Sequence, residues 1–212
     1  MGNVVWNSIY YIFCFLSINY TMEIILASQS PRRKHLLESA NINFSIVTAN
    51  TAETFPSDLS FEQIPIHIAK EKANVAFNKN PNPDNLIIAA DTIVVLDDKI
   101  LGKPKDKEEA ISFLHQLSGN THQVITGVVL LHHQKEISFI EVTEVDFHPL
   151  TSAQIEFYVN EFKPYDKAGA YAIQEWIGLI GIKRIVGDFY NVMGLPISKV
   201  IQAIETIKNP HK

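Results

Sequence analysis

Cationic side chains stand at the start of a predicted helix, where their charge is unfavourable. Residues 23–37 read EIILASQSPRRKHLL, in which a short strand leads to Ser30, a good N-cap, and Pro31, which suits the first helical position. Three cations follow, each disfavoured by the helix dipole by about 0.3–1 kcal/mol: Arg32, Arg33 and Lys34. An anion lying across the helix end would offset this cost, because free N–H groups, the hydroxyls of Ser28 and Ser30 and two guanidinium groups would form a phosphate cradle. The alternative is a solvated basic turn that binds nothing.

Asp91 interrupts the most apolar stretch of the chain. Residues 86–96, LIIAADTIVVL, predict a central strand covered on both faces. A lone carboxylate there costs several kcal/mol unless it is paired, bound to a metal or protonated. We therefore favour a functional role for Asp91 over the alternative of an acid that caps a turn at a strand end. A second acid, Glu53, lies in the middle of the polar loop at 48–60.

Further cations are candidates for the same site as Arg32 and Arg33. They are Lys72, Lys103 and Lys167. Several cations around one or two carboxylates suit a polyphosphate bound with a divalent metal, since carboxylate oxygens are the usual ligands of Mg²⁺ and Mn²⁺.

The sequence lacks the motifs of several other enzyme classes. It has no Walker A loop, no dinucleotide glycine fingerprint, no serine nucleophile elbow and no HExxH motif. Its eight histidines show no metal-ligand spacing. The net charge of -5 argues against a nucleic-acid coat and against binding to an anionic membrane. With 212 residues, of which 46% are hydrophobic, the chain suits one α/β domain or two small lobes.

Residues 1–21 differ from the rest of the chain. They are apolar and aromatic and contain no Lys, Arg, Asp or Glu, yet they lack the basic region and cleavage site of a signal peptide. The apolar run at 4–18 is short for a membrane span. We favour a misassigned start, with the domain spanning 22–212 and a chain that begins at Met22 folding with full activity; a membrane anchor is the alternative. The single cysteine, Cys14, excludes an internal disulfide and fits a cytoplasmic protein.

The remaining chain predicts strands and helices in a mixed order. Strands are expected at 23–26, 44–47, 86–96, 100–101, 123–132, 137–147, 171–174 and 176–182. Helices are expected after Pro31 and at 61–77, 108–117, 151–159 and 196–207. The segment at 187–195 is expected to be a loop, and the strands at 123–132 and 137–147 an antiparallel pair.

Several longer stretches are specific enough for comparison with a known family. They are ASQSPRRKHLL (27–37), IAKEKA (68–73), AADTIVVLDDKILGKP (89–104), LSGNTHQVITGV (117–128), PYDKAGAYAIQ (164–174) and YNVMGLP (190–196). In this order they resemble the Maf family of nucleoside triphosphate pyrophosphatases. A chance match of this length and order is very improbable.

This resemblance implies an α/β fold of the Maf or ITPase-like type, with a mixed curved sheet, flanking helices and two lobes around a cleft. It also implies hydrolysis of a nucleoside triphosphate to the monophosphate and pyrophosphate with a divalent metal, Mg²⁺ or Mn²⁺. Asp91 matches the catalytic aspartate of the family. Its other active-site positions are matched by Ser28, Arg32, Arg33, Glu53, Lys72, Lys103, Lys167 and Gln174. One departure is Ala52, where many members carry an acid just before the residue that matches Glu53.

The residues and the resemblance together suggest a mechanism. Glu53 and Asp91 would hold the metal, and Asp91 would orient or deprotonate a water that attacks the α-phosphorus. Four cations would neutralise the triphosphate and the departing pyrophosphate: Arg33, Lys72, Lys103 and Lys167.

The family that this chain resembles has two branches, one acting on dTTP and UTP and the other on 7-methyl-GTP. In the second, Trp follows the Ser-Pro pair, Gln follows the catalytic Asp and Glu stands at the position of Gln174, which suits a cationic methylated purine. This chain has Arg32, Thr92 and Gln174 instead. The Gln174 amide offers a donor and an acceptor to a neutral uracil or thymine, and the small Thr92 leaves room near the sugar or base. We therefore expect a house-cleaning dTTP and UTP pyrophosphatase, with modified pyrimidine nucleotides as further candidate substrates.

Other functions stay open at this point. One alternative is a pyrophosphatase that prefers 7-methyl-GTP. The others are a nucleotide-binding regulator of septum formation and a membrane-tethered protein. The expected partner is the nucleoside triphosphate substrate. Binding to nucleic acid or to a membrane is not expected, and a homodimer is left open. The expected location is the cytoplasm.

Overall fold

The protein is described here by a computed structural model that covers residues 22–133 and 135–209. Within them, seven strands form one mixed sheet in the order β2-β1-β3-β5-β6-β7, with β4 paired to β3. β1 (Ile24–Leu26) runs parallel to its two neighbours, β2 (Ser45–Ile46) and β3 (Leu86–Leu96). The other pairs are antiparallel and involve β4 (Lys99–Leu101), β5 (Thr121–His132), β6 (Lys135–Phe147) and β7 (Ile182–Val186). The predicted mixed α/β sheet is confirmed.

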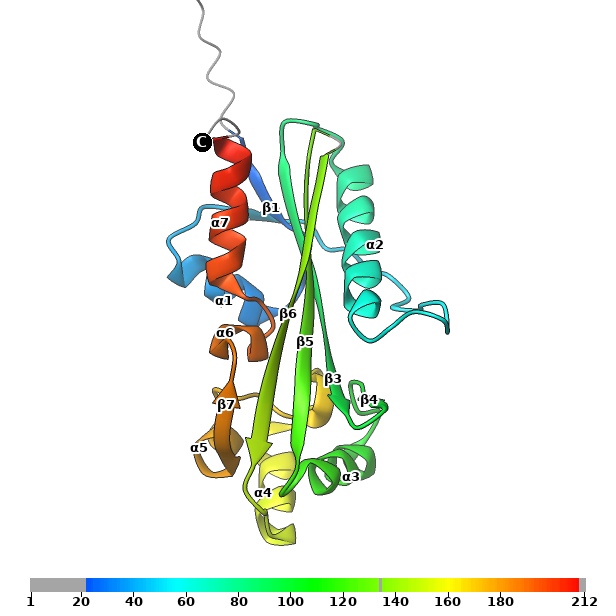
Figure 1. Ribbon diagram of the computed structural model, residues 1–212, viewed down its shortest axis with the longest axis vertical. Helices are drawn as coiled ribbons and strands as arrows, with labels where there is room; N and C mark the ends of the chain where they lie inside the picture. Colours follow the sequence, from blue (N-terminus) through cyan, green and yellow to red (C-terminus); the bar gives the residue numbers. More distant parts are fainter. Residues whose placement is uncertain (1–21, 134, 210–212) are drawn as a thin grey trace, which may run out of the picture.

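Helices gather at both ends of the long strands β3, β5 and β6, which gives the molecule an elongated shape (Figure 1). At one end, α1 (Pro31–Ser39) and α7 (Ile197–Lys208) cover one face of the sheet, and α2 (Gln63–Lys79) covers the other. The other end carries α3 (Lys107–Leu117), α4 (Ser152–Phe162) and α5 (Trp176–Gly181). These two groups are the expected lobes. Burial of β3 under helices on both faces explains its nearly continuous apolar sequence.

Local capping sets the predicted helix starts. The Ser30 hydroxyl accepts a hydrogen bond from the Arg33 backbone N–H at 3.5 Å, with Pro31 as the first helical residue. At the start of α4, Thr151 and Gln154 form a reciprocal capping box. The sequence predicted the Ser30 cap and left Thr151 and Ser152 as alternatives for the second helix, and the structure has Thr151 as its N-cap.

The predicted strands at 171–174 and 176–182 are wrong. A short 3-10 helix (Ala168–Ala170) leads into an irregular segment at 171–175, and α5 follows before the chain enters β7. A short apolar run fits a strand and a buried helix equally well, so periodicity alone could not decide. The predicted loop at 187–195 contains a further short helix, α6 (Phe189–Val192).

Residues 1–21, which we expect to precede the domain because of a misassigned start, lie outside the described residues. A domain start at Met22 therefore stays a prediction. Across residues 22–133 and 135–209, no helix has both the length and the apolar character needed to cross a membrane.

Candidate active site

The side chains proposed from the sequence line a single pocket of about 470 Å³. They come from six separate parts of the chain, including the loop before α1, α2, β3 and the segment around the 3-10 helix. They are Ser28, Arg32, Arg33, Glu53, Lys72, Asp91, Thr92, Lys103, Lys167 and Gln174. The fold thus brings the whole predicted set together.

The pocket lies at a gap in the sheet. β3 pairs with β1 up to Ile88 and with β4 from Val94 onwards, so within the described residues its middle has no strand on that side. Successive side chains of a strand point to opposite faces. Asp91 therefore faces α2 and Thr92 faces α1, yet both line the pocket. The gap lets side chains from both faces of the sheet reach one ligand site.

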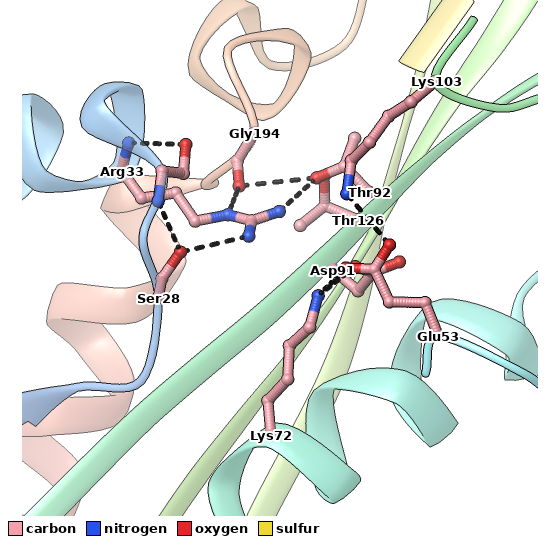
Figure 2. Close-up of polar contacts among 10 residues, drawn as sticks. Ser28, Arg33, Glu53, Lys72, Asp91, Thr92, Lys103, Thr126 and Gly194 are labelled. Carbon is pink, nitrogen blue, oxygen red and sulfur yellow. Dashed lines mark hydrogen bonds and ion pairs between the residues drawn. The ribbon is translucent and has the colours of Figure 1, made fainter. Parts of the chain in front are cut away.

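On the α2 face, two acids and two lysines form a chain of ion pairs, here called the acid–lysine cluster (Figure 2). Lys72 Nζ donates to Asp91 Oδ1 at 2.7 Å and to Glu53 Oε1 at 2.8 Å. Lys103 Nζ donates to the other oxygen, Glu53 Oε2, at 2.9 Å. Lys72 and Asp91 are buried, whereas the Lys103 side chain is 53% exposed. Two positive and two negative charges make this cluster electrically balanced.

A close helix–strand contact lets Lys72 reach Asp91. Gly127 on β5 is the cross-strand partner of Asp91. A Cβ at Gly127 would lie 2.4 Å from the backbone nitrogen of Ile66, near the start of α2. Only glycine therefore allows the backbone of α2 to rest directly on the sheet at this level.

The two lysines that contact Glu53 stabilise its ionised carboxylate. Burial alone would raise the pKa of its carboxyl, but the hydrogen bonds from Lys72 and Lys103 outweigh this effect and lower the pKa from 4.5 to about 2. Its backbone has a φ of 51°, in the left-handed region that side-chain-bearing residues rarely adopt. Such backbone strain is typical of functional sites.

On the opposite face, Arg33 is held by neutral groups, here called the guanidinium cluster (Figure 2). Its Nε donates to the Gly194 carbonyl at 2.7 Å, Nη2 to Thr92 Oγ1 at 2.9 Å and Nη1 to Ser28 Oγ at 3.4 Å. Thr92 Oγ1 also lies 2.9 Å from Thr126 Oγ1. Gly194 and Thr126 were missed from the sequence, although they belong to the YNVMGLP and LSGNTHQVITGV stretches.

The Arg33 charge has no direct counterion among the described residues. Arg33 is buried, and its ion-pair distances to the described carboxylates all exceed 4.0 Å. Burial lowers the pKa of Arg33, while the more distant charge of Asp91 opposes this effect. A buried guanidinium is costly without an anion, so this position favours an anionic ligand.

A third group of charges lies near the 3-10 helix. Asp166 accepts from Arg32 Nη1 at 3.0 Å and from Lys167 Nζ at 2.7 Å. Lys167 also lies 3.4 Å from Glu175 Oε1. Sequence reasoning missed Asp166, although it directly precedes Lys167 in the PYDKAGAYAIQ stretch. The exposed Gln174 follows in the same segment and lines the pocket.

The acid–lysine cluster fits a divalent cation that is shared with a ligand. Among the described residues there is no group of three or more His, Cys, Asp and Glu side chains that could hold a metal alone. Two carboxylates, Glu53 and Asp91, converge on the Lys72 ammonium, so their oxygens face a common point occupied by positive charge. Mg²⁺ commonly uses one or two carboxylates together with phosphate oxygens, and this donor set meets that description.

Comparison with known proteins identifies the family. Residues 23–207 match the family described as Maf-like protein. The chain belongs to the Maf-like family. The resemblance inferred from the sequence is thereby confirmed over almost the whole described chain.

Curated Maf-like relatives are similar along most of their length. The chain is 52% identical over 196 residues to the dTTP/UTP pyrophosphatase of Cytophaga hutchinsonii, covering 92% of this chain and 89% of that protein. It is 48% identical to the dTTP/UTP pyrophosphatase of Phocaeicola vulgatus, covering 87% and 96%. The solved Staphylococcus aureus Ham1 protein has a TM-score of 0.44 and 15% identity, covering 88% and 99%, a similarity too low to bear on function.

Proposed function

We propose that this Maf-like protein hydrolyses dTTP and UTP to the nucleoside monophosphate and pyrophosphate. The observation that carries this proposal is the pocket, in which cations from both faces of the sheet surround two carboxylates at the gap in β3. Relatives of 52% and 48% identity carry the name dTTP/UTP pyrophosphatase. Polyphosphate chemistry needs this combination of anchoring cations and carboxylates.

Asp91 is the proposed catalytic residue. Its Oδ1 accepts from Lys72, which fixes the carboxylate and leaves Oδ2 to accept a proton from an attacking water. A divalent cation, Mg²⁺ or Mn²⁺, held by Glu53 and Asp91 would polarise the phosphate and make such a water more acidic. The buried position of Asp91 at the gap supports this assignment.

The cations have different proposed tasks. Arg33 anchors phosphate oxygens, because its charge has only neutral partners among the described residues. Lys72, Lys103 and Lys167 neutralise the triphosphate and the leaving pyrophosphate. Thr92 has two proposed roles. Its hydroxyl orients the Arg33 guanidinium, and its small side chain leaves room for the sugar or base.

The base is read by Gln174 in this proposal. Its amide carries both a donor and an acceptor, which match the N–H and C=O groups of uracil and thymine. Arg32 and Thr92 support the same branch, since neither offers the flat ring or the acid that suits a methylated purine.

Pyrophosphate release tests the proposal. We expect kcat/KM to be higher for dTTP and UTP than for 7-methyl-GTP, and Gln174→Glu to lower it more for dTTP, because a carboxylate lacks the N–H donor. Gln202→Glu, at an exposed position of α7, is the matched control. A wild-type preference for 7-methyl-GTP would reverse the branch assignment, and absence of pyrophosphate release from any triphosphate would favour a nucleotide-binding regulator.

Two parts of the proposal concern the setting of the enzyme. We place it in the cytoplasm, where nucleoside triphosphates are available; fractionation tests this. A homodimer is tested by the solution mass of the full chain.

A further inference from the structure

A buried tyrosine connects α4 to the part of the pocket that carries Gln174. The Tyr158 side chain on α4 is fully buried. Its hydroxyl donates to Glu175 Oε2 at 2.5 Å and accepts from the Ala172 backbone N–H at 3.2 Å. Both hydrogen-bonding functions of this hydroxyl are therefore used, and both partners flank Gln174.

The second oxygen of Glu175 points to a cation of the pocket. Glu175 Oε1 lies 3.4 Å from Lys167 Nζ, and Lys167 lines the pocket. One carboxylate thus contacts Tyr158 through one oxygen and Lys167 through the other. This arrangement connects the segment proposed to read the base to a cation proposed to bind phosphate.

The backbone around Gln174 is held tightly. Glu175 N–H donates to the Ala172 carbonyl at 3.0 Å, and Gly178 N–H donates to the Glu175 carbonyl at 2.9 Å. A Cβ at Gly178 would lie 1.8 Å from the Ile173 carbonyl oxygen, so α5 presses directly on this segment. The Gln174 side chain is exposed, so packing of that side chain does not anchor the residue. The backbone contacts on either side of Gln174 therefore set its position.

We propose that Tyr158 and Glu175 act as one positioning unit that fixes Gln174 relative to Lys167 and thereby sets pyrimidine specificity. The inference rests on the proposed function of Gln174 and Lys167. Neither Tyr158 nor Glu175 was singled out from the sequence, and Tyr158 does not line the pocket. Burial raises the pKa of the Tyr158 hydroxyl, which keeps it protonated as a donor.

The test compares dTTP with dCTP, which share the triphosphate and sugar but differ in the base. Using their kcat/KM ratio cancels any general change in phosphate binding. Tyr158→Phe keeps the ring in the core and should lower the ratio about tenfold, the value of one hydrogen bond. Glu175→Ala should lower it in the same direction. The double variant should match Tyr158→Phe, because residues that act as a unit are not additive.

Matched controls separate positioning from a general loss of stability. Tyr190→Phe removes an exposed hydroxyl, and Glu156→Ala removes an exposed acid from α4. Both should keep the wild-type ratio. For dTTP, Tyr158→Phe should change mainly KM, with kcat within about threefold, since the reacting groups are untouched. Amide hydrogen exchange should become faster in the segment at 171–175.

Each outcome decides a different statement. If the wild type discriminates and both variants keep the wild-type ratio, the positioning unit is wrong while the proposed function stands. Unchanged amide exchange at 171–175 in Tyr158→Phe also overturns it, without reference to activity. A wild type that releases no pyrophosphate from dTTP contradicts the proposed function; faster exchange in Tyr158→Phe would then still support the structural link. A wild type that hydrolyses dTTP and dCTP equally refutes base reading by Gln174, and the inference with it.

Discussion

The acid–lysine cluster on the α2 face and the guanidinium cluster on the opposite face line the same pocket with different charge arrangements. In the first, Lys72 and Lys103 are paired with Glu53 and Asp91, so positive and negative charges balance. In the second, Arg33 donates only to a carbonyl and two hydroxyls, so its positive charge is not neutralised by direct contact with the described residues.

This difference separates two kinds of work. A balanced cluster has little net attraction for an anion, but in the proposed function its two carboxylates would hold the metal and activate the water. An unbalanced buried guanidinium attracts an anion strongly and fixes its orientation by paired hydrogen bonds. We therefore expect changes to the Asp91 carboxylate on the α2 face to affect mainly kcat, and changes at Arg33 to affect mainly binding.

The largest effect is expected at Asp91. Asp91→Asn keeps the size but removes the charge that is proposed to activate water, so kcat should fall by at least about a hundredfold. KM for dTTP should change little by comparison. Steady-state kinetics and a thermal unfolding curve measure both properties. A folded variant with more than about a tenth of wild-type turnover would remove Asp91 from the chemistry.

Arg33 is expected to give the second largest effect, and on the other kinetic parameter. Arg33→Lys keeps a positive charge but cannot make the three hydrogen bonds, so kcat/KM should fall about ten- to a hundredfold, mainly through KM. Lys34→Ala is the control, because Lys34 is an exposed cation on the same helix. If Arg33→Lys lowered kcat and left KM unchanged, the proposed division of roles between the two faces would be wrong.

A smaller effect is expected at Lys103. Its side chain is half exposed and pairs only with Glu53 among the described residues, so solvent screens its charge. Lys103→Ala should raise KM for dTTP about two- to fivefold without unfolding the domain. Lys105→Ala, at a nearby exposed lysine outside the pocket, should leave KM unchanged. A strong fall in melting temperature with intact kinetics would make Lys103 a structural residue.

The smallest effect concerns acid stability. The pKa of Glu53 is 4.5 ordinarily and about 2 in the fold, so the unfolded chain takes up a proton first as pH falls. This contribution to the free energy of unfolding is complete above pH 4.5 and is lost as pH falls towards 2. Glu53→Gln should therefore weaken the pH dependence of stability in this window, as measured by denaturant unfolding. The guanidinium cluster has neutral acceptors, so Thr92→Val should leave that dependence unchanged.

The chain's local patterns were sufficient for most helices and strands. The continuous apolar run at 86–96 predicted β3 with its observed bounds, and Ser30 with Pro31 marked the start of α1. Each of these signals depends on residues within one or two turns of each other. The run at 176–182 carried no such signal, because six or seven apolar residues fit a strand or a helix, and the packing of Gly178 on Ile173 decided for α5.

The sequence predicted ten residues that line the pocket but missed Asp166 and Gly194, and the pairing of all these residues was decided by the tertiary structure. Nothing local to Arg33 indicates that its partner is the Gly194 carbonyl, 161 positions away, or that Lys72 joins Glu53 to Asp91. These contacts depend on strand order and on the gap between β1 and β4, which lets Asp91 and Thr92 reach one site from opposite faces of the sheet. Hydrogen bonds and ion pairs act over a few ångströms, so partners distant in sequence are chosen only when the sheet has brought them together.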